Sequence, residues 1–141
     1  MKRITSSTPP RLDQVLPREE ILRLQELVRR LPVADHIFQY AAKLVRATRP
    51  GEEGASELAA SWLNYGAGPR ASLFLILAGK ARAILRGRYH VAIEDVQAVA
   101  PPVLRHRIIP NFAAQSEGLT ADHLIGKLLE TIPADERLYA S

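Results

Sequence analysis

Tyr65-Gly66-Ala67-Gly68-Pro69-Arg70-Ala71 opens the most apolar segment of the chain, which continues through Ala78 and becomes amphipathic as far as Arg86. Proline suits the first position of a helix, because its missing N–H is not needed there and its fixed φ is already helical. Gly68 can take the extended conformation that a following proline demands. The stretch therefore predicts a helix over residues 69–86, with Arg70 in its first turn and Gly87 as its C-cap.

The start of this predicted helix suits an anion. Free backbone N–H groups and the positive end of the helix dipole attract negative charge there. Arg70 adds a planar, permanently charged group that matches phosphate oxygens. Glycine-proline turns are also common before buried helices, and Arg70 would then simply point into solvent. Spacing alone favours this simpler interpretation over a phosphate contact.

Apolar periodicity and capping signals predict an all-α fold, a small helical bundle. Besides the central helix, we expect helices over residues 17–31, 34–48, 56–63, 92–100 and 121–132. Pro101-Pro102 should end the helix that begins at residue 92, with room for a short turn after it through Leu104, and residues 112–118 should form a loop. Strand signals are scarce and allow at most a minor two-stranded β ribbon from residues near Val91 and Ile108.

Composition patterns divide the chain into one domain and two tails. Residues 1–14 lack periodicity and read as a linker, residues 15–133 form the domain, and residues 134–141 form a C-terminal tail. In the first helix, Ile21, Leu24 and Val28 make one apolar stripe. The first half of the central helix is apolar on nearly all sides, so neighbours should bury it on more than one face. Trp62, the single tryptophan, is expected to anchor packing.

The chain has 141 residues, of which 47% are hydrophobic and 24% are charged, which suits one globular domain. No run is long enough to span a bilayer, so we expect no membrane partner. The absence of cysteine excludes disulfides and thiolate sites, and we expect a cytoplasmic protein. The net charge of +4 and a pI of about 9.8 raise nucleic acid as a partner. The excess of positive charge is modest, and the basic residues are mostly interspersed with apolar ones, so nucleic acid binding is not expected.

The motifs of a complete active site are missing. The chain has no G-x-x-x-x-G-K-[ST] loop, and Gly79-Lys80 is followed by alanine within a predicted helix. It has no G-x-S-x-G and no H-E-x-x-H. The four histidines lack metal-ligand spacing, so no metal site is expected. The cluster Arg105-His106-Arg107 could bind phosphate or an acidic neighbour, or it could face solvent or another subunit.

Several motifs resemble the C-terminal lid domain of MoxR-family AAA+ ATPases, and the similarity covers nearly the whole chain, from about Val15 to Pro133. The motifs that carry the resemblance are Gly66-Ala67-Gly68-Pro69-Arg70-Ala71, Gly87-Arg88-Tyr89-His90-Val91, Glu94-Asp95-Val96 and Ala100-Pro101-Pro102-Val103-Leu104-Arg105-His106-Arg107-Ile108. The resemblance implies a helical lid that follows a nucleotide-binding α/β core. We expect that core, with its Walker motifs, first sensor and arginine finger, to lie outside this chain.

The resemblance also implies roles for particular residues. The family's Gly-x-x-Pro-Arg-Ala motif carries the second sensor arginine, which contacts the γ-phosphate of ATP, and this arginine corresponds to Arg70. The resemblance therefore favours the phosphate contact over simple helix punctuation. Gly68 and Pro69 are the accompanying nucleotide-binding candidates. The first two helices should also cover the adenine side, where Tyr40 and Leu44 are candidates.

For the intact protein, the resemblance implies ATP hydrolysis with Mg²⁺ held by the missing core. Family members form ring oligomers, commonly hexamers, and act as chaperone-like factors. They often work with client or partner proteins that carry von Willebrand factor A domains. This chain alone is not expected to hydrolyse ATP. The alternatives left open are a stand-alone protein-interaction module and a basic helical nucleic-acid binder.

Overall fold

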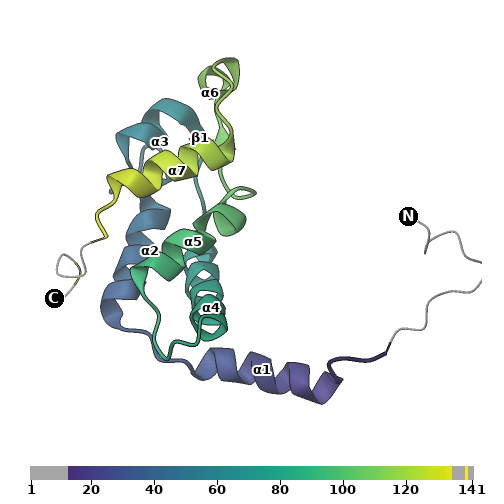
Figure 1. The fold of residues 1–141 in the computed structure, drawn as a ribbon. Helices are drawn as coiled ribbons and strands as arrows, with labels where there is room; N and C mark the ends of the chain where they lie inside the picture. Colours follow the sequence, from purple (N-terminus) through teal and green to yellow (C-terminus); the bar gives the residue numbers. More distant parts are fainter. Residues whose placement is uncertain (1–12, 135–138, 140–141) are drawn as a thin grey trace, which may run out of the picture.

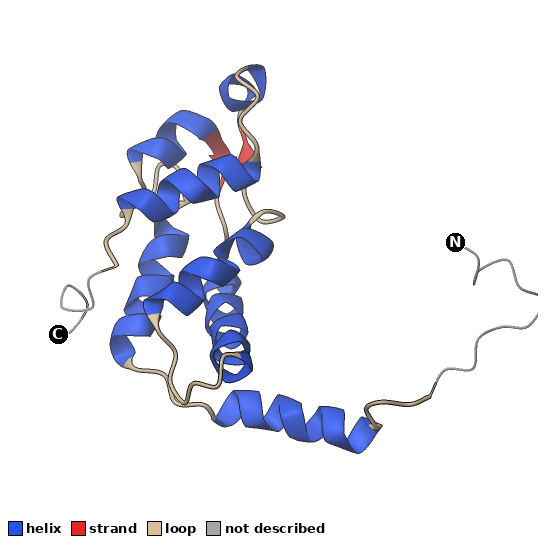
Figure 2. Cartoon of the chain, in the orientation of Figure 1, coloured by secondary structure: helices blue, strands red, loops and turns tan. Residues whose placement is uncertain are grey.

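The computed structural model describes residues 13–134 and Tyr139, which form seven helices and one two-stranded ribbon (Figures 1 and 2). In chain order the elements are α1 (Arg18–Arg30), α2 (Asp35–Ala47), α3 (Glu57–Trp62), β1 (Leu63–Tyr65), α4 (Arg70–Leu85), α5 (Ile93–Leu104), β2 (Ile109–Pro110), α6 (Phe112–Ser116) and α7 (Ala121–Thr131). The expected all-α fold class with a minor ribbon is confirmed. The predicted domain bounds stay a prediction, and residues 1–12, 135–138 and 140–141 lie outside the described residues.

The core lies between α4 and its neighbours. Helix α4 packs against α5 and α2, and α7 closes the far side of α5 (Figure 1). The largest fully buried apolar side chains are Tyr40, Ile37, Leu44, Leu75, Ile93, Leu104, Leu124, Ile125, Leu128 and Val96. Burial of each Leu or Ile contributes roughly 1.5–3 kcal/mol, so this cluster is the main source of stability. Trp62 is half-buried against it, which is the expected packing role.

Helix ends follow capping chemistry where a polar cap exists. Ser56 accepts a hydrogen bond from the Ala59 N–H at 3.0 Å, and Thr120 accepts one from the His123 N–H at 3.3 Å, as expected for caps. Gly87 has φ +70°, which confirms the predicted glycine at the end of α4. The expected loop over residues 112–118 is wrong, because Asn111 accepts from the Ala114 N–H at 2.9 Å and so begins the short helix α6.

The ribbon pairs different segments from those expected. β1 pairs antiparallel with β2, with Leu63 opposite Pro110 and Tyr65 opposite Ile109. The prediction of a strand near Ile108 was therefore nearly right, but Val91 is not its partner. Val91 is buried and packs against α4 instead, where a methyl group lies 3.3 Å from the position of a Cβ on Gly79. The need to fill this gap beside α4 outweighs the local strand propensity of Val91.

Helix α5 does not end at Pro101-Pro102 as predicted but continues to Leu104. Prolines inside a helix each remove a backbone hydrogen bond and cost about 3 kcal/mol. Two features offset this cost. Ala100 and Leu104 are fully buried on either side of the prolines, and the Arg105 N–H still bonds to the Pro101 carbonyl at 3.0 Å. Packing therefore overrides the local signal.

Two apolar surfaces, on α1 and on α4, are exposed to solvent. Helix α1 has no buried residue, and it extends away from the bundle as an arm (Figure 1). Leu73 on α4 is 69% exposed, and Phe74 and Leu77 are 46% and 45% exposed. We expected neighbours to bury α4 on more than one face, and this is wrong for the side that carries Leu73, Phe74 and Leu77. Helix α1 covers only part of that side. One contact between α1 and α4 is a hydrogen bond of 2.9 Å that the Lys80 ammonium donates to the Arg29 backbone carbonyl.

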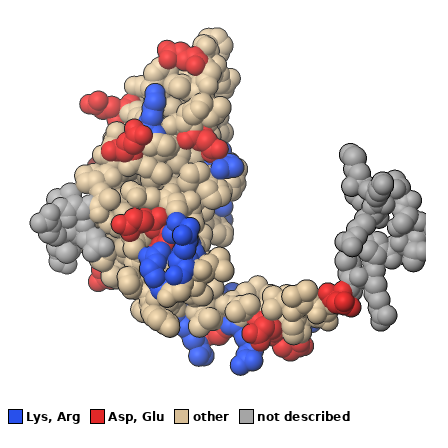
Figure 3. All heavy atoms as spheres, viewed as in Figure 1, with Lys and Arg blue, Asp and Glu red and all other residues tan. Residues whose placement is uncertain are grey.

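The face of the molecule drawn in Figure 3 carries both signs of charge. A group of basic side chains on the lower part of the bundle lies directly beside acidic ones, and the other charged side chains are scattered. This face lacks the long single-sign stripe that marks many nucleic-acid binders. Among the described residues, no helix has the length and apolarity needed to cross a membrane.

Candidate functional site

Arg70 lies on the surface at the start of α4. Its helix begins within one residue of the predicted position, because Pro69 already has helical angles of φ −56° and ψ −30°. The Arg70 side chain is exposed, and it forms no hydrogen bond or ion pair with the other described residues. Its guanidinium is therefore available to an external anion.

The electrostatics of this helix start are unusual. The first turn of α4 contains no acidic residue, although carboxylates are favoured at the positive end of a helix dipole. A cation there is disfavoured by roughly 0.3–1 kcal/mol. The expectation of several free N–H groups is only partly met, because those of Ala71 and Ser72 bond to the Gly68 and Pro69 carbonyls at 2.9 and 3.1 Å. Attraction for an anion thus comes mainly from the guanidinium and the dipole.

Thr48, at the C-terminal end of α2, fixes the segment that leads into Arg70. Its side chain is fully buried. The Thr48 hydroxyl donates to the Val45 carbonyl at 2.6 Å and accepts from the Ala67 N–H at 2.9 Å. Ala67 is itself fully buried three residues before Arg70. The hydroxyl therefore positions the start of α4 relative to α2, a role that the sequence analysis missed.

The two glycines before Pro69 differ in their surroundings. A Cβ on Gly66 would lie 2.2 Å from the Thr48 carbonyl oxygen and 2.6 Å from the Arg49 Cα, so only glycine fits there. At Gly68 nothing lies within 4 Å of an added Cβ. Gly66 is therefore required for packing against the end of α2. Gly68 borders open space beside Arg70, which suits close approach of a ligand.

A buried carboxylate joins the second half of α4 to α5. Asp95 is fully buried, its Oδ1 accepts from Arg82 at 2.7 Å and from Arg88, and its Oδ2 accepts from the Ala92 N–H at 3.0 Å. Burial alone would raise the Asp95 pKa, but the hydrogen bonds from Arg88, Ala92 and Arg82 outweigh it and lower the pKa below its ordinary value. This cluster fixes the orientation of the helix that carries Arg70.

The structure does not support Tyr40 and Leu44 as adenine contacts. Both side chains are fully buried in the core. The Tyr40 hydroxyl accepts a hydrogen bond from Gln97 at 3.1 Å, and its ring packs edge-on against Tyr139 at a centroid distance of 5.6 Å. Burial raises the Tyr40 pKa. These residues support the bundle and do not reach a ligand at its surface.

The predicted cluster Arg105-His106-Arg107 is divided between different roles. Arg105 pairs with Asp122 on α7 at 3.2 Å. Arg107 contacts the His106 ring and lies over the Phe74 ring, 4.9 Å from its centroid. In the part of the chain that the structure describes, no group of three or more metal-ligating side chains comes together. Arg105 therefore has an acidic neighbour, as one of the predicted alternatives allowed, while His106 and Arg107 contact each other.

The fold and the exposed arginine together define a small helical domain that presents a cation at a helix start. The family model described as AAA lid domain matches residues 55–128, which is more than half of the chain. The chain therefore belongs to the AAA lid domain family and is a lid of the MoxR type.

Relatives extend this similarity over most of the chain. The Chaperone MoxR1 of Mycobacterium tuberculosis is 37% identical over 125 residues, which are 89% of this chain and 33% of that protein. Protein MoxR of Methylorubrum extorquens is 39% identical over 71 residues, 49% of this chain and 20% of its own length. A solved structure of a candidate ATPase from Cytophaga hutchinsonii has a TM-score of 0.83 and 30% identity, covering 96% of this chain and 41% of that one.

The uncharacterized protein YeaC of Bacillus subtilis is also similar, with 28% identity over 121 residues, 86% of this chain and 35% of its own length. The chain thus spans about a third of the length of the first two curated relatives it matches. The activity of a whole protein of this kind is therefore a proposal for this chain.

Proposed function

We propose that this chain acts as the nucleotide-sensing lid of a MoxR-type AAA+ ATPase, in which Arg70 contacts the γ-phosphate of ATP. The observation that carries the proposal is the exposed, unpartnered Arg70 at the start of α4. The match of the AAA lid domain and the position of Arg70 in the motif Gly66-x-x-Pro69-Arg70-Ala71 support it.

The residues around Arg70 fit an anionic phosphate. The guanidinium supplies charge-assisted hydrogen bonds, which are favoured where negative charge develops during phosphoryl transfer. Gly68 leaves room beside it, and Thr48 with Gly66 holds this segment on α2. Movement of α4 as part of a rigid bundle would then carry Arg70 toward or away from the phosphate and report the nucleotide state.

The remaining properties of the intact protein follow from the family. We infer that ATP and Mg²⁺ bind to an AAA+ core, which holds the metal, and that the protein forms a ring of identical subunits. The name of the Mycobacterium tuberculosis relative supports a chaperone-like role. Clients with von Willebrand factor A domains and a cytoplasmic location are part of the same proposal.

A chimera tests the proposal. The matching segment of the Cytophaga hutchinsonii protein, which is 41% of that chain, would be replaced by this chain, and ATP hydrolysis would be measured. We expect Arg70→Ala to lower kcat by about a hundred- to a thousandfold, the range for loss of one preorganised charge contact. Arg86→Ala, an exposed arginine at the other end of α4, is the matched control and should leave kcat unchanged. If the Arg70→Ala chimera keeps the full kcat of the parent chimera, the proposed role of Arg70 is contradicted.

A further inference from the structure

Helix α1 carries an apolar stripe that continues beyond the bundle. Near its C-terminal end α1 is held on α4 by the hydrogen bond from Lys80 to the Arg29 carbonyl, and its first turns extend away from the bundle (Figure 1). Ile21, Leu24 and Val28 lie at i, i+3 and i+7 and therefore share one face of the helix. Val28 lines a hollow of about 520 Å³ beside α4, whereas Ile21 and Leu24 are 41% and 43% exposed on the projecting part. We call this projecting stripe of Ile21 and Leu24 the arm stripe.

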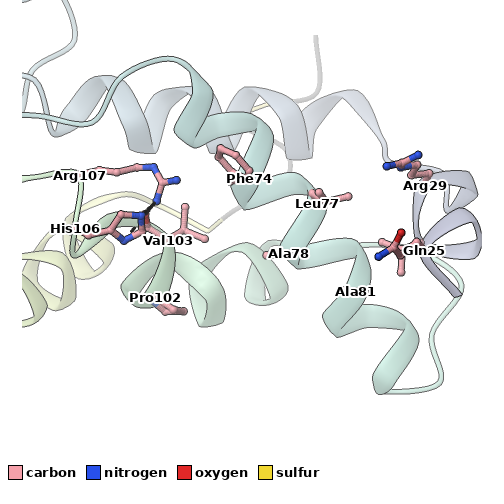
Figure 4. A pocket seen from close by; sticks show the side chains of 11 residues that line it. Gln25, Arg29, Phe74, Leu77, Ala78, Ala81, Pro102, Val103, His106 and Arg107 are labelled. Atoms are coloured by element: carbon pink, nitrogen blue, oxygen red, sulfur yellow. Dashed lines mark hydrogen bonds between the residues drawn. The ribbon is translucent and has the colours of Figure 1, made fainter. Parts of the chain in front are cut away.

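Helix α4 presents a matching apolar ridge next to the arm. Leu77 lies between the hollow of about 520 Å³ and a second one of about 260 Å³, and it lines both. Phe74 borders the first hollow and Leu73 the second. Figure 4 shows Phe74 and Leu77 along α4, with Gln25 of α1 across the first hollow from them. We call Leu73, Phe74 and Leu77 the Leu77 ridge.

The arm of one molecule cannot cover its own ridge. Figure 1 shows α1 running crosswise to α4, so the arm stripe leaves α4 behind after Val28. Sharp bends in a helix occur at Pro, at Gly/Ser pairs or where the hydrogen-bond ladder is interrupted, and Arg18–Arg30 contains no Pro, Gly or Ser. Leu31, which follows the helix, is buried and fixes that end in the core. Both apolar surfaces therefore need a second molecule to cover them.

Together the two surfaces have the size of one half of a dimer interface. The five side chains of the arm stripe and the Leu77 ridge are each between 41% and 69% exposed. They present on the order of 400 Å² of apolar surface. Interfaces are about 57% apolar, so a contact that buries this surface covers roughly 700 Å² per chain. A stable complex of standard size buries about 800 Å² per partner.

We propose that two copies of this chain associate by exchanging arms, with the arm stripe of each copy packed on the Leu77 ridge of the other. Each chain carries both surfaces, so a two-fold axis pairs each arm with the opposite ridge and the assembly closes at two copies. An apolar helix face laid against a groove is a common mode of association between helical proteins. This contact does not use Arg70 and therefore goes beyond the nucleotide-sensing role.

Sedimentation equilibrium of the whole chain tests the association. Buried area does not fix affinity, so the concentration is varied widely. We expect the 15.6 kDa monomer at about 1 µM and twice that mass at about 300 µM. Amide exchange of α1 should slow over the same concentration range, because the arm is free only in the dilute monomer. A chain that stays monomeric at the upper concentration overturns the proposal, and growth beyond two copies contradicts the two-fold closure.

Two leucines of α1 provide a matched pair of variants. Leu24→Asp places a charge in the arm stripe, and it should weaken the dimer at least tenfold. Leu22→Asp is the control, because Leu22 is also exposed but lies about 200° around the helix from Leu24. It should dimerise like the parent chain. Since α1 contains no buried residue, neither change should disturb the bundle. Equal weakening by the two variants contradicts the assignment of the arm stripe.

A mixing experiment tests which surface meets which. Leu77→Asp damages the ridge and leaves the arm intact, so it should also be monomeric alone. A mixture of Leu24→Asp and Leu77→Asp chains should form a heterodimer, because the intact arm of the second fits the intact ridge of the first. Pairing of arm with arm, or of ridge with ridge, would give no such rescue. A mixture that stays monomeric therefore overturns the exchange of arms. Leu73→Asp, at a more exposed position of the ridge, replaces Leu77→Asp if that chain does not fold.

Other occupants of the two surfaces have their own signatures. Arg70→Ala should dimerise like the parent chain, so that failure of the dimer and failure of the nucleotide-sensing role are distinguishable. The chimera with the Cytophaga hutchinsonii protein, compared with the isolated chain by hydrogen exchange, tests the remainder of a larger protein as the occupant. Protection of α1 in the chimera, together with an isolated chain that is monomeric at about 300 µM, would identify that remainder and overturn a second copy.

Discussion

The Thr48 hydroxyl accepts a hydrogen bond from the Ala67 backbone N–H at 2.9 Å, across 19 positions of sequence. Both groups are fully buried, so water cannot replace this bond. It joins the last residues of α2 to the loop that leads into Arg70. The orientation of the candidate sensor arginine therefore depends on a threonine outside its own motif.

Thr48→Val should destabilise the chain because it keeps the side-chain volume and removes the acceptor of a buried N–H. An unsatisfied buried donor costs roughly 1–3 kcal/mol of unfolding free energy. Thr131→Val is a matched control, since its hydroxyl also donates to a carbonyl three residues earlier, at 2.8 Å, but lies on the exposed end of α7. Urea unfolding measures both. Equal losses of unfolding free energy in the two variants would show that the hydrogen bond from the Ala67 N–H to Thr48 adds no stability of its own.

Gly66→Ala and Gly68→Ala should differ strongly although the sites are two positions apart. A Cβ at Gly66 meets the Thr48 carbonyl at 2.2 Å, so the backbone must shift, at a cost of about 1–3 kcal/mol or more. A Cβ at Gly68 meets nothing within 4 Å, and its effect should stay below about 1 kcal/mol. Thermal unfolding of the two variants checks this order, and a less stable Gly68 variant would contradict it.

The central helix and its start could be predicted because proline, glycine and the apolar run agree on the same boundary. The caps Ser56 and Thr120 were predictable for the same reason, since a polar side chain at a helix start has one simple use. Arg70 was a candidate from the dipole and from the family motif. In each of these cases the local sequence and the three-dimensional packing favour the same conformation.

Other features depend on contacts that the sequence does not reveal. Pro101-Pro102 is a strong breaking signal, but burial of Leu104 carries α5 past it. Val91 looks like a strand residue and instead fills space beside Gly79. The sequence does not indicate that Thr48 and Asp95 hold neighbouring helices in place. Their partners Ala67 and Arg82 lie 19 and 13 positions away along the chain. The Asp95 carboxylate could be foreseen only as a partner of the Ala92 N–H.

Asp95 should make stability depend on acid pH. Its folded pKa lies below the ordinary value of 3.8, so the stabilisation is complete above that pH and is lost as pH falls through the lower folded pKa. Asp95→Asn removes the charge and should cost about 2–4 kcal/mol at pH 7, toward the low end for a buried pair because Arg82 and Arg88 keep 29% and 32% exposure. Urea unfolding from pH 7 to pH 2.5 measures this.

The difference between parent and Asp95→Asn should shrink as pH falls below about 4, because the parent then also loses the charge. Asp122→Asn, which removes the partner of Arg105 in a pair with 52% exposure on each side, should cost less than about 1 kcal/mol. A constant difference for Asp95→Asn across the whole range would exclude the proposed ion cluster as its cause.

Helix α1 should exchange its amide hydrogens faster than the bundle. It contains no buried residue, whereas α4 buries Ala71, Leu75, Ile76, Gly79 and Ala83. Local opening of α1 therefore exposes little apolar surface and has a low free energy. Hydrogen exchange read by mass spectrometry should show α1 exchanged well before α4. Protection of α1 equal to that of α4 in the isolated chain would contradict the view of α1 as a weakly attached arm.

The most direct test of the central claim compares nucleotides that differ only in the γ-phosphate. In the chimera with the Cytophaga hutchinsonii protein, the ratio of Kd for ADP to Kd for a slowly hydrolysed ATP analogue would be measured for the parent, Arg70→Ala and Arg86→Ala. If Arg70 contacts the γ-phosphate, Arg70→Ala should lower this ratio by about tenfold, equivalent to the 1.4 kcal/mol or more expected of one charge-assisted contact, while Arg86→Ala keeps it. An Arg70→Ala chimera with the parent's ratio would contradict the account.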